Sequence, residues 1–257
     1  MKRYKSKIIT FFSTICFISL IFSSCEGMFG GIYDDPVNED DKHNNKNIYG
    51  FTSYDENTHR GTMYINVSDY DKWLYISLKN KTFDTVFIPQ SLTQDWDGKS
   101  GIHYHYVKGS QFTLDSIVKT NKQTDPKTWD IALHRFEAKV NGGAFETSFT
   151  STDQLPVTSE SFDDIIYTED EWIDTLVMTD RNGMLNYYIG YQNIMCNKVL
   201  SNWLRMDISN PPPTYHPSDK VYILRFEDNT KAALHFDNYL SPSGITAFVT
   251  VSFIYPY

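Results

Sequence analysis

The chain lacks the sequence patterns of several large enzyme classes. It contains no Gly-x-Ser-x-Gly, no glycine-rich phosphate-binding loop and no His-Glu-x-x-His. It has no apolar run of the roughly 20 residues that a membrane-spanning helix needs. Its formal net charge of -9 disfavours nucleic acid and anionic lipid as partners, because both favour clusters of Lys and Arg. We therefore expect that the protein is not an enzyme.

Cysteine is also scarce, and the beginning of the chain accounts for two of the three cysteines. Three Lys or Arg occur within the first five residues, an almost uncharged apolar stretch covers residues 8–22, and two serines precede Cys25. This order is typical of a lipoprotein signal peptide, so we expect residues 1–24 to be removed and Cys25 to carry lipid. Cys16 would leave with the signal, and Cys196 alone cannot form an internal disulfide. The mature protein should be attached to a membrane by its lipid without crossing it.

Residues 25–50 are predicted to form a flexible tether between the lipid and the folded domain. Their Gly, Asp, Glu, Asn and Lys side chains cannot bury enough apolar surface to form a core. Acidic residues soon after a lipidated cysteine resemble the surface-export signal of Bacteroidota lipoproteins, although a solvated linker explains the same composition. The remaining residues, 51–257, are sufficient for one domain with its own core.

This domain is predicted to be all-β and predominantly antiparallel. Short aromatic and β-branched runs, which favour strands, cover residues 63–67, 73–78, 221–226 and 247–253. The polar residues 227–230 predict a turn into a further strand over residues 232–236. No long segment has a 3.6-residue apolar period, so we expect little helix, and a mostly parallel α/β fold is disfavoured.

Isolated polar side chains give only weak indications of a site. His103 and His105 have a spacing that a metal could use on one strand face, but no third ligand follows nearby, and a half-buried strand is the better interpretation. His134 lies in a strand-like run, where we expect a hydrogen-bonded structural histidine. The carboxylates at 163–164 and 169–171 lie in polar sequence that predicts loops, and a glycosidase would need two of them in one cleft.

Several segments together resemble the HmuY family, the haem-binding lipoproteins of Bacteroidota. The matching segments are residues 129–135 with Asn141-Gly142-Gly143, residues 62–78, Trp203-Leu204, Pro213-Thr214-Tyr215 and residues 247–256. They look like the family's signature strand and turn, its first strands and its C-terminal part, in the family's order. Residues 89–124 look like an insertion that the resemblance does not cover.

The resemblance implies a haemophore-like protein of the outer membrane, lipid-anchored and exposed at the cell surface. Such a protein captures haem, as free haem or from host haemoproteins, and delivers it to a TonB-dependent outer-membrane transporter for iron acquisition. An alternative is an HmuY-fold surface lipoprotein that has lost haem binding and acts as an accessory binding protein for another ligand.

The resemblance also implies the positions of the haem ligands. In the type member two histidines clamp the iron, and this chain keeps neither: Met184 stands at the first position and Ile208 at the second. Relatives in the family resemble one another in using thioether ligands, so Met184 and Met206, two residues before Ile208, are the expected axial ligands. Thioethers favour ferrous haem. Methionine also fills core gaps readily, and Met178, Met195 and His216 remain alternatives for either position.

The haem pocket is expected to be apolar with aromatic walls. Tyr188 and Trp203 are the principal candidates, although either could belong to an ordinary β core. Further candidates for the walls are Tyr187 and Tyr191, and candidates for pairing with the haem propionates are Lys198, Arg205 and His216. Cys196 is expected to be a small buried hydrophobe rather than a further soft ligand.

Overall fold

The computed structural model describes residues 44–88, 104–107, 111–114, 124–175, 177–181, 190–209 and 212–257. These residues belong to one compact unit that begins at Lys42, and residues 1–41, with the predicted signal peptide and Cys25, lie outside the described part. No helix among the described residues is long and apolar enough to cross a membrane.

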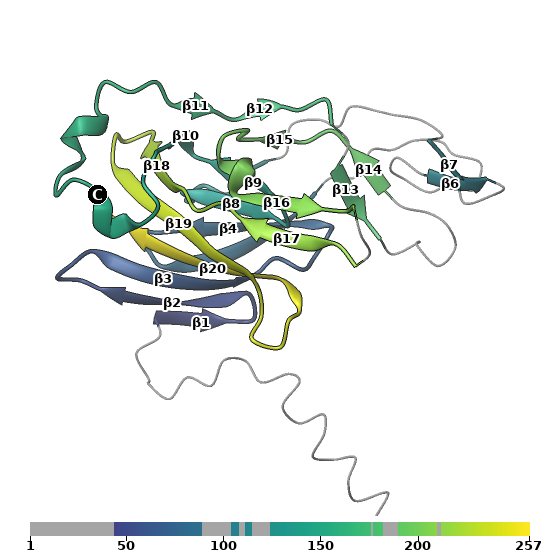
Figure 1. Cartoon of the computed structure of the whole chain (residues 1–257), viewed down its shortest axis with the longest axis horizontal. Coiled ribbons are helices and arrows are strands. Elements are labelled where there is room, and N and C mark those ends of the chain that lie inside the picture. The colour runs from purple at the N-terminus through teal and green to yellow at the C-terminus, as the bar shows by residue number, and fades with distance from the viewer. Residues whose placement is uncertain are drawn as a thin grey trace, which may run out of the picture. The chain divides into compact units, whose positions relative to one another are not determined.

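Two antiparallel sheets form the body of the domain (Figure 1). The larger sheet has eight strands in the order β1 (Asn44–Asn47), β2 (Gly50–Asp55), β3 (Arg60–Asn66), β20 (Thr246–Ile254), β19 (Lys231–Leu240), β18 (Val221–Phe226), β10 (Gly142–Glu146) and β11 (Thr168–Glu169). The smaller sheet has the order β5 (Thr82–Phe87), β4 (Lys72–Ser77), β8 (Ile131–His134) and β9 (Glu137–Val140).

Four two-stranded hairpins or pairs accompany these sheets. They are β6 (Tyr104–Val107) with β7 (Gln111–Leu114), β12 (Glu171–Trp172) with β15 (Met195–Cys196), β13 (Val177–Asp180) with β14 (Gly190–Gln192), and β16 (Leu204–Asp207) with β17 (Thr214–Pro217). The described helices are short 3₁₀ turns: η1 (Thr152–Gln154), η2 (Ser159–Phe162) and η4 (Leu200–Trp203).

The structure confirms the strands that the sequence predicted. The four aromatic and β-branched runs form most of β3, β4, β18 and β20, and only Val67 and Leu78, at the ends of their runs, lie outside the strands. Residues 227–230 join β18 to β19 as expected. In β20 buried and half-buried residues alternate, as they must when one face of a strand covers a core. All described strand pairs are antiparallel, which confirms the all-β antiparallel class.

The main core lies between the two sheets. Met63 and Val251 come to it from the larger sheet, and Leu74 and Leu133 come from the smaller one. Trp203 is completely buried at its centre, with its ring 4.4 Å from that of Phe236. β4 is buried on both faces, because Trp73 and Tyr75 on its other face pack in a second cluster with Val177, Ile194 and Cys196.

Gly142 shows why the signature turn after β9 requires glycine. Its φ of 146° is unfavourable for other residues, and a Cβ there would lie 2.1 Å from the carbonyl oxygen of Arg225 on the neighbouring strand. The close approach of β10 to β18 therefore depends on this position.

The predicted boundaries need one adjustment. Residues 44–50 were assigned to the tether, but β1 and the start of β2 lie there and extend the larger sheet. The rest of the tether lies outside the described residues. Within the predicted insertion, the described residues form the β6–β7 hairpin, and His105 lies in β6 as expected for a strand, whereas His103 lies outside the described part.

Candidate functional site

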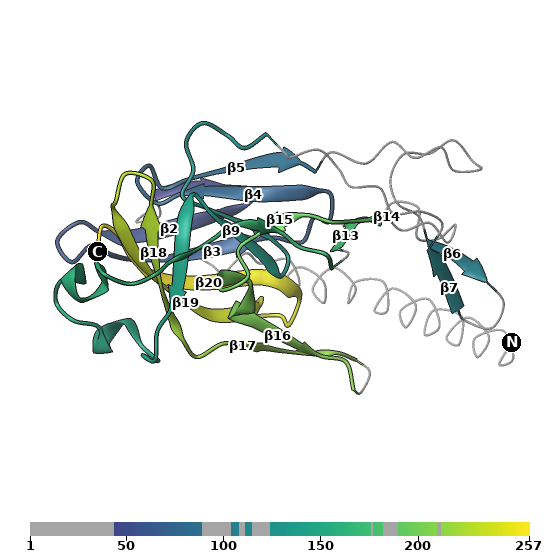
Figure 2. The same ribbon diagram turned by 90° about the horizontal axis from the view of Figure 1, so that it is seen from above.

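Two hairpins carry the positions that the sequence singled out, and both lie at the same end of the two sheets (Figures 1 and 2). β13–β14 flanks the segment that contains Met184 and Tyr188, and both of these residues lie outside the described part. β16–β17 carries Met206, which is described.

Met206 lies on the inner face of its hairpin. In the β16–β17 register it is paired with Tyr215, whose ring contacts the rings of Phe136 and Tyr239 at centroid distances of 6.1 and 4.9 Å. Directly paired residues project from the same face of an antiparallel ladder, so Met206 is next to the Tyr215 ring. Its side chain is nevertheless 43% exposed. Met206 is thus open to a ligand without any opening of the core.

The neighbouring pair, Arg205 with His216, projects from the opposite face of the same hairpin. Both side chains are exposed, and His216 Nε2 lies 3.1 Å from the hydroxyl of Thr214. On this hairpin Met206 therefore faces the aromatic residues, and His216 faces away from them.

A continuous row of aromatic and guanidinium groups connects the loop end of β13–β14 with β16–β17. Arg181, directly after β13, donates to the hydroxyl of Tyr70 at 2.9 Å and lies 4.7 Å from its ring centroid. Arg135 lies 4.0 Å from the same ring and 5.6 Å from the ring of Phe136, which in turn contacts Tyr215. We call these five residues the platform.

The β8–β9 turn holds Arg135 in place. Arg135 has a φ of 52° in this two-residue turn, is only 7% exposed, and donates through Nη1 to the carbonyl oxygen of Ser68 at 3.0 Å. Its Nη2 lies 3.5 Å from the hydroxyl of Tyr239, and its buried Nε has no partner among the described residues. A buried donor without a partner costs free energy, so this guanidinium retains capacity for one more acceptor.

His134 holds the backbone of Tyr70, a platform residue, in place. It is 1% exposed, donates through Nε2 to the carbonyl oxygen of Tyr70 at 2.7 Å, and has Nδ1 3.0 Å from Oε2 of Glu137. These two contacts fix the loop that presents the Tyr70 ring. The expectation of a hydrogen-bonded structural histidine is confirmed.

Trp203 lies beneath the platform rather than on its surface. Its side chain is fully buried, and its indole Nε1 donates to the carbonyl oxygen of Phe136 at 2.9 Å. Trp203 therefore positions Phe136 and the start of β16, and it contributes no exposed wall of its own.

The other candidate residues occupy separate environments. Met178 is paired with Tyr191 in β13–β14, Met195 is paired with Trp172 in β12–β15, and Lys198 forms an ion pair with Glu171 at 2.7 Å. Cys196 is buried, and burial raises the pKa of its thiol to about 11, so it is protonated at neutral pH. No group of three or more metal-binding side chains (His, Cys, Asp or Glu) occurs in the part of the chain that the structure describes.

Sequence reasoning missed most of the platform. Tyr70, Arg135 and Arg181 belong to three segments that are far apart in the chain, and no local pattern connects them. The available signals were the position of Arg181, three residues before Met184, and the presence of Arg135 in the signature segment.

Comparisons with known proteins agree with this fold. A family model described as HmuY protein matches residues 69–253. A Bacteroides vulgatus protein proposed to be an HmuY-like haem-binding protein is 31% identical over 83% of this chain and 99% of its own, with a TM-score of 0.58. A proposed lipoprotein from Bacteroides fragilis is also 31% identical, over 79% of this chain and 92% of its own, with a TM-score of 0.57.

The apo form of an HmuY analogue from Tannerella forsythia shares the fold. It has 20% identity and a TM-score of 0.53, over 80% of this chain and 97% of that one. The comparison with curated proteins gives no match. The matched length of the family model and the two relatives with 31% identity together establish that this chain belongs to the HmuY family.

Proposed function

We propose that this protein is a surface lipoprotein that binds haem between the β13–β14 and β16–β17 hairpins. Membership of the HmuY family and the relative proposed to bind haem support the ligand. The observation that carries the location is the platform, which connects the loop end of β13–β14 with β16–β17 through Arg181, Tyr70, Arg135, Phe136 and Tyr215. It offers aromatic surface to a porphyrin and guanidinium groups to its carboxylates.

Methionine ligation of the iron is the second part of the proposal. Met206 is exposed and lies on the face of its hairpin that also carries Tyr215, and Met184 belongs to the segment between β13 and β14. A pair of thioethers would supply soft axial ligands that favour ferrous iron. His216 is the weaker candidate, because it projects from the opposite face.

The surroundings of the macrocycle follow from the same geometry. Tyr188 is proposed as an aromatic wall and Trp203 as the buried support below Phe136. Arg181 is a better propionate partner than Lys198, because it lies on the platform, whereas Lys198 is paired with Glu171. The unpaired Nε of Arg135 fits the same need for an anionic acceptor.

The cellular role is proposed from the sequence and the family. Lipid on Cys25 would anchor the protein in the outer membrane, where it would take up haem as free haem or from host haemoproteins and pass it to a TonB-dependent transporter. The neighbour proposed to be a lipoprotein is consistent with this placement. The second candidate function is an accessory binding protein for another ligand. It is favoured because Met184 and Ile208 stand at the positions of the two family histidines.

Methionine variants test the ligation. The chain from residue 26, which contains the whole compact unit, would be titrated with haem and reduced with dithionite. Met184→Ala and Met206→Ala should each abolish the sharp low-spin bands of the ferrous complex, while the matched controls Met178→Ala and Met195→Ala should retain them. If a control variant lost the bands instead, haem would bind but Met184 and Met206 would not be its ligands. No bands in any protein, the wild type included, would refute haem binding.

A further inference from the structure

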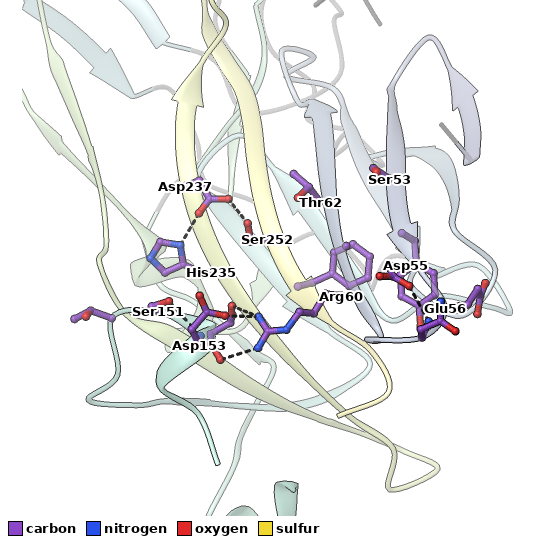
Figure 3. A pocket seen from close by; sticks show the side chains of 16 residues that line it. Ser53, Asp55, Glu56, Arg60, Thr62, Ser151, Asp153, His235, Asp237 and Ser252 are labelled. Carbon is purple, nitrogen blue, oxygen red and sulfur yellow. Dashed lines mark hydrogen bonds and ion pairs between the residues drawn. The ribbon is translucent and has the colours of Figure 1, made fainter. Parts of the chain in front are cut away.

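A polar cleft of about 970 Å³ lies on the outer face of the larger sheet (Figure 3). Its lining comes from β2, β3, β19 and β20, from the β2–β3 turn and from residues 150–153 around η1. No described residue of β13–β17 contributes to it, so the cleft is separate from the platform and the two hairpins. Its volume is in the range of small-molecule sites.

Four polar side chains form a row across the floor of the cleft. Ser53 of β2 is paired with Thr62 of β3, Thr62 with Ser252 of β20, and Ser252 with His235 of β19. Directly paired residues share a face, and neighbouring strands lie about 4.8 Å apart, so this row repeats regularly across the sheet. It offers hydroxyl and imidazole groups to an extended ligand that lies across the strands.

The charges in the cleft are largely compensated by one another. Arg60 forms an ion pair with Asp153 at 2.9 Å and donates to the hydroxyl of Thr152 at 3.0 Å. On the other side, Asp237 accepts from Ser252 at 2.7 Å and lies 2.6 Å from Nδ1 of His235 (Figure 3).

Glu56, at the β2–β3 turn, is similarly paired with Lys81 at 3.0 Å. The carboxylate of Asp55 accepts from the backbone N–H of Asn57 at 2.8 Å, and this hydrogen bond lowers the pKa of Asp55. A cleft whose charges are already paired provides directional donors and acceptors but no strong attraction for an ion.

An aromatic strip borders the polar row on the same face. Phe51 stacks on Tyr64 with ring centroids 5.5 Å apart, and Tyr64 stacks on Phe248 at 6.0 Å. Phe51 and Tyr64 each lie two residues from a member of the polar row, and successive residues on one strand face are two apart. All three rings are partly exposed.

We propose that this cleft binds a neutral, polyhydroxylated ligand of the size of a short oligosaccharide. Sugar hydroxyls need paired donors and acceptors of the kind that the row, Asn57 and the paired carboxylates provide. The C–H faces of a sugar pack on aromatic rings, which the strip beside the cleft supplies. An apolar ligand would leave these polar groups without partners. An anion would meet four carboxylates, those of Asp55, Glu56, Asp153 and Asp237, against Arg60 and His235.

Calorimetric titration with a panel of neutral trisaccharides tests the proposal. The probes are maltotriose, cellotriose, mannotriose and triacetylchitotriose at millimolar concentration, with spermidine as a cationic comparison. At least one trisaccharide should bind to the chain from residue 26. Thr62→Trp should weaken that binding by about tenfold or more, because the new ring fills the floor of the cleft and aromatic residues are tolerated in strands.

The matched control is Thr82→Trp, which adds the same ring to an exposed position of β5 on the other sheet. This control should bind the sugar like the wild type. Circular dichroism melting of both variants checks that they fold, and their haem spectra should be unchanged, which separates this site from the proposed haem site. The proposal is overturned if none of the four sugars binds, if only spermidine binds, or if Thr62→Trp binds a sugar as well as the wild type does.

Discussion

Lys139 is a buried cation whose removal should destabilise the protein. Its side chain is 5% exposed, forms an ion pair with Asp125 and donates to the hydroxyl of Tyr75 at 3.3 Å. The ammonium nitrogen also lies 5.5, 5.4 and 5.1 Å from the ring centroids of Trp73, Tyr75 and Trp129. Asp125 precedes β8 in the chain, so this ion pair attaches the segment that leads into β8 to the smaller sheet.

The cost of Lys139→Met comes chiefly from the carboxylate of Asp125, which loses its ion-pair partner. Removing one member of a fully buried ion pair costs about 3–5 kcal/mol, chiefly because the other charge loses its partner. The side chain of Asp125 is 21% exposed and still accepts from Tyr75 at 2.6 Å, so the lower end applies. The methionine retains most of the apolar packing of the lysine stem, so lost packing adds little to this cost. We expect a loss of about 3 kcal/mol.

Urea unfolding of the single and double variants measures this cost. Lys139→Met should lower the free energy of unfolding by about 3 kcal/mol without a change in the slope. Lys139→Met combined with Asp125→Asn should recover about half of that loss, because the uncompensated carboxylate is gone. A loss below about 1 kcal/mol in the single variant, or a double variant no more stable than the single one, would refute the reasoning.

Three further predictions follow from the described contacts. Burial raises the pKa of Asp170 to about 6 from its ordinary value of 3.8, so the native state binds the proton more tightly and the free energy of unfolding should fall as the pH rises through this range. Asp170→Asn should lack this fall, which amounts to at most about 3 kcal/mol, in urea titrations at pH 4 and pH 7; parallel curves for the two proteins would contradict the assignment. Arg181→Met should weaken the binding of haem but not of haem dimethyl ester, measured by absorption titration, and an equal effect on both would exclude a role in carboxylate recognition. Met206→Ala should cost less than about 1 kcal/mol of stability because its side chain is 43% exposed, whereas Trp203→Ala should cost about 3–5 kcal/mol because its side chain is fully buried; equal losses in thermal melts would show that the two environments are misassigned.

The sequence predicted the features that depend on local patterns. The strands β3, β18 and β20 each have a run of β-branched and aromatic residues, and the polar turn before β19 interrupts two such runs. The hydrogen-bonded His134 was expected from its strand-like run, and the buried Cys196 from the residue type. These predictions succeeded because alternation along one strand is visible within a few residues.

The sequence did not predict the features that depend on long-range packing. Asp170 lies in a polar run that predicted a loop, yet it is half-buried and its carboxylate accepts from the backbone N–H of Val140 at 3.1 Å. The residues of β1 have a tether-like composition and form a strand only because β2 pairs with them. The row formed by Arg181, Tyr70 and Arg135 arises from the packing of three separate segments, and composition gives no sign of it.

The most direct test of the proposed function is a haem titration of the wild-type chain from residue 26, followed by visible absorption with and without dithionite. We predict saturation at one haem per chain and sharp low-spin bands that are stronger in the reduced state, because thioether ligands favour ferrous iron. Only the broad bands of free haem in both states would contradict haem binding, and bands that are sharp in the oxidised state alone would contradict methionine ligation.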